Sequence, residues 1–385
     1  MDIRPSARTN GPQRPLRKPD AIIDEAAEDK VDTKKNRWYR RIGWWWIVIA
    51  LVVVLIAGLG AWWYLGQKKV TTVDVHKAVI PPKPKTVENP LTGAQVSAAD
   101  AAMPAVGIMI ENLDPNARPQ SGLGQAGIVY EALAEGGITR FLAIFQQPYP
   151  TTIGPVRSLR PYYLDWDQEY QTPIAHAGGS MPALAALPLS GAEDINALLY
   201  DGPYFYRAAD RAAPHNFYTN NILLPQLQLK LGFNKPLSVQ GRPRKTDQPA
   251  SGVVAHPTIN INFSYSDYAV EYKYDGPSDS YARWMAGTTH VDRNTNKQIM
   301  VKNVIVEYIP VSYSTQGNGD PQTNYADIGS GKALVFMDGN VTTATWTKTS
   351  ATSQTQIADA SGNPIKLNVG NTWFEMVPTT NQVTY

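Results

Sequence analysis

Residues 128–146 read IVYEALAEGGITRFLAIFQ. Two apolar segments, 128–135 and 138–146, flank the adjacent glycines Gly136 and Gly137. Glycine supplies the positive φ angles that a short hairpin turn requires, and β-branched and aromatic residues favour strands. The stretch therefore predicts a β-hairpin, which is the strongest fold signal in residues 91–235.

Strands and helices alternate around this hairpin. The expected strands are 105–111 (AVGIMIE) and 172–177, and the expected helices are 158–170, 181–187 (MPALAAL) and 222–231 (ILLPQLQLKL). Small polar residues precede each helix and can accept a hydrogen bond from its first turn: Ser158, Ser180, and Asn220 or Asn221. The pattern predicts a mixed α/β domain over residues 91–235.

The composition changes in the second half of the chain. Residues 236–252 are polar and rich in proline, which predicts an interdomain linker. Residues 253–378 carry strand patterns, clearest at 303–310, 333–337 and 341–348, and Asp338-Gly339 predicts a hairpin turn between the last two. The fold class expected is α+β, with the mixed α/β domain followed by a smaller β-rich domain.

One uncharged segment precedes both domains. Residues 42–67 read IGWWWIVIALVVVLIAGLGAWWYLGQ, longer than the roughly 20 apolar residues that cross a bilayer. Tryptophan and tyrosine mark both ends, as they do at membrane interfaces. The segment predicts a transmembrane helix. A cleaved signal peptide is the alternative, but the apolar span is too long and Trp62 and Trp63 occupy the region where a cleavage site would stand.

Flanking charges set the expected orientation. Five basic residues precede the segment, and only two follow closely: Lys34, Lys35, Arg37, Arg40 and Arg41 before it, Lys68 and Lys69 after it. The positive-inside rule then places the N-terminus in the cytoplasm. We expect a disordered cytoplasmic tail at 1–41, a proline-rich spacer at 68–90, two extracytoplasmic domains, and a short tail at 379–385.

Composition excludes several classes of function. The chain has 385 residues, a formal net charge of +2 and no cysteine. The small net charge argues against nucleic-acid binding. Without cysteine there can be no disulfide, thiolate metal site, cysteine nucleophile or lipid-modified cysteine. No metal-binding motif occurs, and no cofactor is expected.

Arginines gather in the loops of the first domain, next to glycine, proline or strand ends: Arg118, Arg140, Arg157, Arg160, Arg207 and Arg211. A guanidinium matches phosphate and carboxylate groups, so several arginines in one cleft would form an anion site, with His215 and Asn216 adding polar contacts. The alternative is that they pair with carboxylates, of which the candidates are Glu111, Glu131, Glu135, Asp165 and Asp210.

Few residues are candidates for catalysis. His176 and Glu135 are the candidate acid/base groups, because an imidazole or a carboxyl can exchange a proton near neutral pH. The alternative is that His176 is a structural histidine. Ser180 follows His176 by four residues, but capping a helix already explains it. Glu131 and Glu135 share one face of a strand, a weak signal for a carboxylate pair.

Aromatic residues stand out in the second domain: Tyr265, Tyr268, Tyr272, Tyr274, Tyr281, Trp284 and Trp346. Aromatic faces suit sugar rings, but strands also use these residues for packing. Packing is the interpretation that we adopt for them.

Longer motifs resemble a known family. The stretches IENLDPNARPQSGLGQAGIVYEALAEGGITRF, IGPVRSLRPYYLD, HAGGS and RAADRAAPHN, followed by KNVIVEY, GKALVFMDG and LNVGNTWFEMVP, are similar to the YerB-like family of bacterial cell-surface proteins. The match runs from about residue 90 to 378. The resemblance implies two consecutive domains, a mixed α/β one and a smaller β-rich one, and it implies no established activity. The family is described as lipoproteins, but this chain has no cysteine to carry a lipid.

Three functions remain open. The first is an extracytoplasmic domain that binds an anionic glycan or a phosphate-bearing wall polymer through the arginines. The second is a hydrolase or transferase that acts on such a polymer. The third is a scaffold that docks a protein partner, which predicts an exposed apolar patch on residues 253–378. The sequence does not determine the oligomeric state.

Overall fold

The computed structural model describes residues 44–67, 85–252 and 254–385. The chain divides into two units, residues 1–81 and 82–385. The described part of the first unit is helix α1 (Trp44–Gly66). Among the described residues, one helix is long and apolar enough to cross a membrane, at Trp45–Gly66 with a mean hydropathy of 2.4. The expected tail at 1–41 and most of the expected spacer lie outside the described residues.

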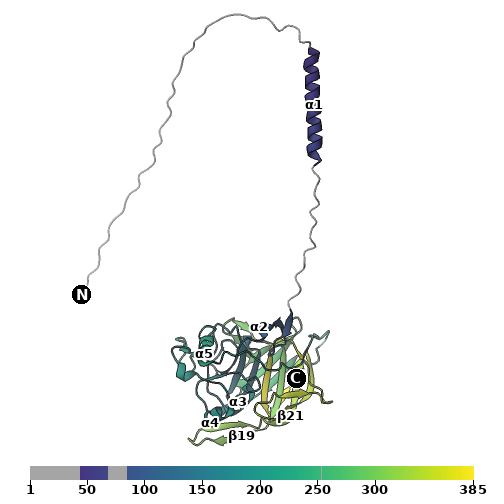
Figure 1. Ribbon diagram of the computed structural model, residues 1–385. Helices are drawn as coiled ribbons and strands as arrows, with labels where there is room; N and C mark the ends of the chain where they lie inside the picture. The colour runs from purple at the N-terminus through teal and green to yellow at the C-terminus, as the bar shows by residue number, and fades with distance from the viewer. Residues whose placement is uncertain (1–43, 68–84, 253) are drawn as a thin grey trace, which may run out of the picture. The chain divides into compact units, whose positions relative to one another are not determined.

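A single large sheet organises the second unit (Figure 1). Ten strands follow one another across it: β23 (Gln356–Ala358), β22 (Asn340–Lys348), β21 (Gly329–Met337), β18 (Asn303–Ile309), β25 (Thr372–Pro378), β4 (Ile128–Leu133), β5 (Thr139–Gln146), β3 (Ala105–Glu111), β6 (Ile174–His176) and β7 (Asp194–Asn196). Strands β3, β4 and β25 are buried along their whole length, as expected for continuous apolar strands covered on both faces.

The sheet is continuous between the two halves of the unit. Strand β25 pairs in parallel with β4, with Thr372 opposite Ile128 and Glu375 opposite Glu131. On its other side β25 pairs in parallel with β18. The α+β architecture is confirmed, and its two domains share one sheet and one hydrophobic core.

Both predicted hairpins are present. Strands β4 and β5 pair antiparallel around a short 3₁₀ turn (η2, Glu135–Gly137), in which Gly136 and Gly137 have φ values of 69° and 72°. Strands β21 and β22 pair around Asp338 and Gly339, with φ values of 54° and 69°. Residues other than glycine and a few short polar ones rarely adopt this conformation, which explains the turn chemistry at both sites.

Four α-helices lie in the described part of the first domain: α2 (Ala98–Ala101), α3 (Pro161–Asp167), α4 (Met181–Ser190) and α5 (Leu223–Leu231). Ser180 caps α4 by accepting a hydrogen bond from the backbone of Ala183, as predicted. The side chain of Asn220 accepts from the backbone amides of Ile222 and Leu223 at the start of α5. The helix expected at 158–170 is shorter at both ends, since α3 begins at Pro161 and ends at Asp167. Ser158 does not cap it, because its side chain donates to the carbonyl of Ala177 and the residue before Pro161 is extended.

A smaller antiparallel sheet completes the fold. Its members are β11 (Thr258–Asn262), β12 (Ala269–Asp275), β13 (Ser280–Met285), β14 (Thr288–Thr289), β17 (Met300–Val301) and β26 (Val383–Thr384). Strand β26 lies in the expected C-terminal tail and pairs with β11. Tyr272, Tyr281 and Trp346 are buried, as expected for packing residues, whereas Tyr265 is exposed.

Two segments expected to be linkers carry structure. Strand β1 (Thr86–Glu88), at the end of the expected spacer, pairs with β2 (Gln95–Ser97). Within 236–252, Leu237 and Arg242 are buried, and β10 (Arg244–Lys245) pairs in parallel with β24 (Leu367–Asn368). The polar composition of this segment therefore reflects specific polar contacts.

Candidate functional site

Glu111, the last residue of β3, gathers two of the predicted site residues around its carboxylate. Its side chain is only 4% exposed, and its backbone amide donates to the carbonyl of Pro155. A buried carboxylate requires charged or hydrogen-bonding partners, because isolated burial of its charge is costly. Arg157 and His215 are those partners.

Arg157 reaches Glu111 from the extended segment after Pro155. Its Nε atom lies 3.1 Å from Glu111 Oε1. Its backbone donates to the carbonyl of Met109 and accepts from the amide of Ala177, which fixes the segment beside β3. The side chain is 28% exposed. No acceptor among the described residues engages its two terminal nitrogens, so their hydrogen-bonding capacity is unused within the described part of the chain.

His215 approaches the same carboxylate from the loop between β8 (Tyr206–Arg207) and β9 (Phe217–Tyr218). Its Nδ1 atom lies 3.0 Å from both oxygens of Glu111. The ring is 15% exposed, and no described residue engages Nε2. A carboxylate at Nδ1 orients the imidazole and selects the tautomer that leaves Nε2 as an acceptor in the neutral ring.

Arg207 and Asn216 adjoin this group. Arg207 donates from Nε to Asp201 at 3.2 Å and from Nη1 to Asn216 Oδ1 at 3.4 Å. Its guanidinium also stacks on the ring of Phe217, 3.9 Å from the centroid. Asn216 donates to the carbonyl of Ala208. We call Glu111, Arg157, Arg207, His215 and Asn216 the Glu111 site.

Arg140 and Arg160 form a separate pair beside Glu135. Arg160 donates to the Glu135 carboxylate from Nε at 2.8 Å and from Nη2 at 2.5 Å. Burial acts to raise the pKa of Glu135, but the hydrogen bond and charge of Arg160 outweigh it and lower that pKa. Arg140 is buried and donates to the carbonyl of Ser158, and burial lowers its pKa to about 10. Glu135 is thus held as a paired carboxylate, which suits it poorly for acid catalysis.

His176 is enclosed. It is 0% exposed, with Nδ1 at 2.8 Å from the carbonyl of Gly178 and Nε2 at 2.8 Å from Asp194 Oδ1. Both ring nitrogens have partners, so the geometry favours the structural alternative for this histidine.

Arg118 and Arg211 form hydrogen bonds with loop residues outside the Glu111 site. Arg118 donates to Asn112 and to the carbonyl of Asp267, and forms an ion pair with Asp114 at 3.2 Å. Arg211 donates to the carbonyls of Ala117 and Pro119 and to Tyr218. The structure therefore distributes the six arginines over several groups, and two of them, Arg157 and Arg207, belong to the Glu111 site.

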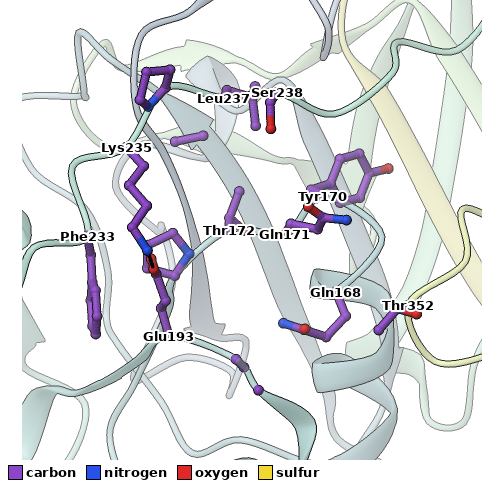
Figure 2. Close-up of a pocket in the computed structure, with 15 residues that line it drawn as sticks. Gln168, Tyr170, Gln171, Thr172, Glu193, Phe233, Lys235, Leu237, Ser238 and Thr352 are labelled. Carbon is purple, nitrogen blue, oxygen red and sulfur yellow. Dashed lines mark hydrogen bonds and ion pairs between the residues drawn. The ribbon is translucent and has the colours of Figure 1, made fainter.

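A cavity of about 360 Å³ opens at the other end of β3 (Figure 2). Ala105, the first residue of the strand, lines it together with Gln168, Thr172 and Ser238. An ion pair between Lys235 and Glu193 stands at its side. None of the predicted site residues lines this cavity. Its walls come from five separate segments, and no single motif in the sequence signals it.

Exposed apolar side chains gather away from the expected patch on residues 253–378. Met181, Leu184 and Leu189 on α4 and Leu198 and Leu199 on η3 (Ala197–Tyr200) are exposed. Among the described residues of the second domain, the exposed large apolar side chains lie far apart in the sequence: Tyr265, Tyr313, Ile328, Val369 and Tyr385. Such isolated residues are ordinary on protein surfaces.

Comparison with known proteins places this fold in a family. Residues 91–233 match the protein of unknown function (DUF3048) N-terminal domain, and residues 259–374 match the DUF3048 C-terminal domain. The chain is 33% identical over 309 residues to "Putative lipoprotein YerB" of Bacillus subtilis (strain 168), covering 79% of this chain and 90% of that protein.

A solved structure agrees with this assignment. The crystal structure of the YerB protein from Bacillus subtilis matches with a TM-score of 0.69 and 30% identity, covering 78% of this chain and all of that one. The two matched domains appear in the same order as in the sequence resemblance. The chain therefore belongs to the YerB-like family, whose two consecutive domains are the N- and C-terminal domains of DUF3048.

Proposed function

We propose that the chain is a membrane-anchored receptor domain that binds an anionic group of a cell-envelope polymer at the Glu111 site. The observation that carries this proposal is the meeting of Arg157 and His215 on one buried carboxylate, while no described residue engages the two terminal nitrogens of Arg157 or Nε2 of His215. A guanidinium, and an imidazole that is protonated at both nitrogens, donate the charge-assisted hydrogen bonds with which proteins bind phosphate and carboxylate.

The buried carboxylate of Glu111 orients the side chains of Arg157 and His215. Glu111 fixes one edge of Arg157 and one nitrogen of His215, so neither side chain has to be ordered when a ligand arrives. Preorganised donors cost less conformational entropy on binding. Glu111 also offsets part of the positive charge, so the site suits a single phosphate or carboxylate better than a densely charged chain.

The proposed anchoring is supported by α1 and by the charges that flank it in the sequence. We infer that Trp45–Gly66 spans the membrane, that the basic N-terminal side stays in the cytoplasm and that residues 82–385 stand outside. The relative from Bacillus subtilis bears the name of a lipoprotein. In this chain an uncleaved helix would attach the protein to the membrane in place of a lipid. A C-terminal alkaline phosphatase fusion should be active in cells. An inactive fusion together with a fluorescent cytoplasmic reporter would contradict this orientation.

Calorimetry tests the ligand proposal directly. The full chain in detergent is titrated with phosphate-bearing wall-polymer fragments and with neutral glycan fragments of the same length. We expect binding of the phosphate-bearing fragments only, and a loss of about tenfold or more in affinity for Arg157→Gln, since a charge-assisted hydrogen bond contributes about 1.5–3 kcal/mol. Lys366→Gln removes one exposed charge far from Glu111 in sequence and should bind normally. Equal affinity of Arg157→Gln and the unsubstituted chain would exclude the Glu111 site.

A second candidate function is hydrolysis or transfer on the same polymer. The pairing of Nδ1 with Glu111 favours it, because this arrangement leaves Nε2 available as a general base. Product release from the polymer, measured by chromatography, should then require His215, and His215→Gln should lose turnover to a greater extent than it loses binding, because Arg157 remains. Absence of any released product from the unsubstituted chain would leave binding as the function.

A further inference from the structure

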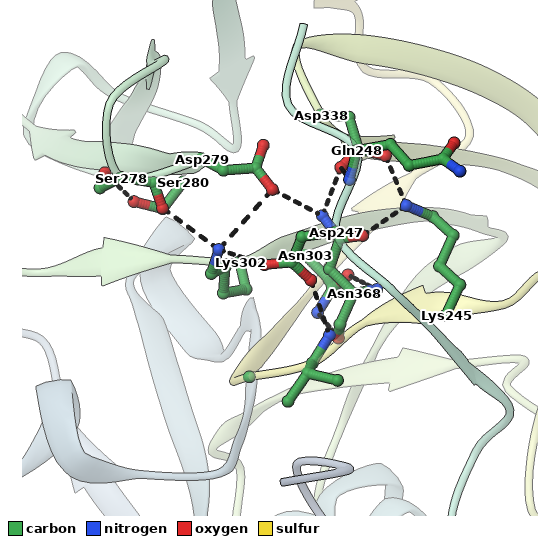
Figure 3. Close-up of polar contacts among 12 residues, drawn as sticks. Lys245, Asp247, Gln248, Ser278, Asp279, Ser280, Lys302, Asn303, Asp338 and Asn368 are labelled. Atoms are coloured by element: carbon green, nitrogen blue, oxygen red, sulfur yellow. Dashed lines mark hydrogen bonds and ion pairs between the residues drawn. The ribbon is translucent and has the colours of Figure 1, made fainter.

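Lys245 and Asn368 lie side by side on the paired strands β10 and β24. The two residues are direct partners in this parallel ladder, so their side chains leave the same face. Lys245 Nζ lies 2.5 Å from Asn368 Oδ1, and Asn368 is fully buried. Figure 3 shows the ammonium group of Lys245 joined to both Asn368 and Asp338.

Asp338 bridges the lysine and the amide. Its Oδ2 accepts from Lys245 Nζ at 2.6 Å, and its Oδ1 accepts from Asn368 Nδ2 at 2.7 Å. A second carboxylate, Asp279, accepts from the same Nδ2 at 3.3 Å. These partners settle the orientation of the amide, because an ammonium can only donate and a carboxylate can only accept.

The asparagine is held rigidly in this position. Its backbone amide donates to Asn303 Oδ1 at 2.8 Å, and its carbonyl accepts from Asn303 Nδ2 at 3.0 Å and from Arg244 at 2.9 Å. Amine, amide and carboxylate thus meet in one fixed geometry, and proximity of this kind replaces the entropy of bringing two reactants together.

We propose that Lys245 and Asn368 join in an intramolecular isopeptide bond, formed by the protein itself with Asp338 as the proton carrier. Lys245 first gives one proton to Asp338, which leaves a neutral amine. Nζ then attacks Cγ of Asn368. Asp338 passes its proton to Nδ2 and takes one from Nζ, the Cγ–Nδ2 bond breaks, and ammonia leaves. The new Nζ–Cγ amide forms with no oxidant, reductant or other reactant.

The first of these proton transfers starts from an ion pair. Burial acts to raise the pKa of Asp338, but the hydrogen bonds of Lys245 and Asn368 outweigh it and lower that pKa, so the resting state is an ion pair. Partial burial lowers the free energy needed to convert such a pair into a neutral amine and a neutral acid, because water solvates the two charges less well there. Asp338 touches both the nucleophile and the departing nitrogen and needs no movement to serve both.

The bond would fasten the segment between the two domains to the second one. Lys245 and Asn368 are 123 positions apart in the sequence. A covalent link across so long a stretch removes conformational freedom from the unfolded chain. It would also reinforce a parallel ladder that consists of two residue pairs, immediately before the central strand β25.

Intact-protein mass spectrometry of the full chain tests the proposal. We expect a mass below that of the sequence by one ammonia molecule, and a tryptic peptide that contains residues around both 245 and 368. Lys245→Arg and Asp338→Ala should both have their full sequence masses. Lys302→Arg changes the neighbouring lysine, which pairs with Asp247 at 2.6 Å, and should keep the deficit.

Two results would overturn the proposal. One is a full sequence mass for the unsubstituted chain, with Lys245 and Asn368 recovered in separate linear peptides. The other is an ammonia deficit that maps to any other pair of residues. Both readings come from the unsubstituted protein, so they hold even if a variant fails to fold. A deficit that persists in Asp338→Ala would remove Asp338 from the reaction.

Discussion

Glu131 and Glu375 lie directly opposite each other on the parallel strands β4 and β25, and both are fully buried. One arginine, Arg283 of β13, contacts Glu131 through Nη2 and Tyr272 through Nε at 3.0 Å. Tyr272 in turn donates to Glu375. The two DUF3048 domains therefore meet at a shared polar cluster that holds two carboxyl groups, one guanidinium, the phenol of Tyr272 and the imidazole of His290, whose Nδ1 contacts Arg283 Nη1.

This cluster makes stability depend on pH. Burial, and then the charge of Glu131, raise the pKa of Glu375 to about 8. In the unfolded chain the same group titrates near 4.5. Between these values the folded state binds the extra proton, so the free energy of unfolding falls as pH rises, by about 1.4 kcal/mol per pH unit for one such group. We expect urea unfolding to show a more stable protein at pH 5 than at pH 8.

The variant Glu375→Gln tests the origin of this slope. Glutamine keeps the shape of the protonated carboxyl and cannot ionise, so the decline in stability from pH 5 to pH 8 should become shallower. It should not vanish, because burial also raises the pKa of Asp167 and of Glu307 to about 8. An unchanged slope in the variant would show that Glu375 is not protonated in the folded state.

Removing Arg283 should be severe. Arg283→Met would leave Glu131 buried without its counter-ion, and breaking a buried pair from one side costs about 3–5 kcal/mol. Arg293→Met is the matched control, because Arg293 pairs with Asp210 in a solvent-exposed position and such pairs contribute little. Denaturant unfolding at pH 7 distinguishes the two. Equal midpoints for both variants would contradict this account of the cluster.

Gly107 in β3 tests the packing of the sheet against α3. A Cβ atom at this position would lie 1.9 Å from Asp167 Oδ1, and Asp167 is fully buried. Gly107→Ala should therefore cost about 1–3 kcal/mol, the usual penalty for overpacking. Gly276→Ala is the control, since its nearest neighbour would be 4.0 Å away. Thermal unfolding should show a lower Tm for the first variant only.

Local chemistry made parts of this fold predictable. The β4–β5 and β21–β22 hairpins follow from glycine and aspartate at their turns, and the cap of α4 follows from Ser180. The pairing of β25 with β4 was not predictable in the same way, because it joins segments from different domains. The register of such a pair is set by tertiary packing, which no local pattern encodes.

The sequence indicated which residue types and loops could form a site, but not which partner each side chain has in the folded chain. Arginine next to glycine and proline indicated functional loops, but each guanidinium has its own partner in the folded chain. Arg160 lies on Glu135 and Arg157 on Glu111, two carboxylates that the sequence named as possible partners. Which arginine keeps nitrogens that no described residue engages depends on how these loops pack. The position of His215 beside Glu111 depends on a contact across 104 residues.

A double-mutant cycle on Glu111 and Arg157 tests whether the site is built as one unit. Glu111→Gln leaves Arg157 and His215 facing an amide, and losing a charged partner in a buried position should cost about 1–3 kcal/mol. Arg157→Gln should also destabilise, because it strands the carboxylate. Since both variants remove the same interaction, the double variant should be less destabilised than the sum of the two, with a coupling of about 0.5–3 kcal/mol measured by urea unfolding. Strict additivity would mean that Glu111 does not hold Arg157 in place. The control is a second cycle on the more exposed pair Glu193 and Lys235, which should show only the small coupling of an ion pair that solvent screens.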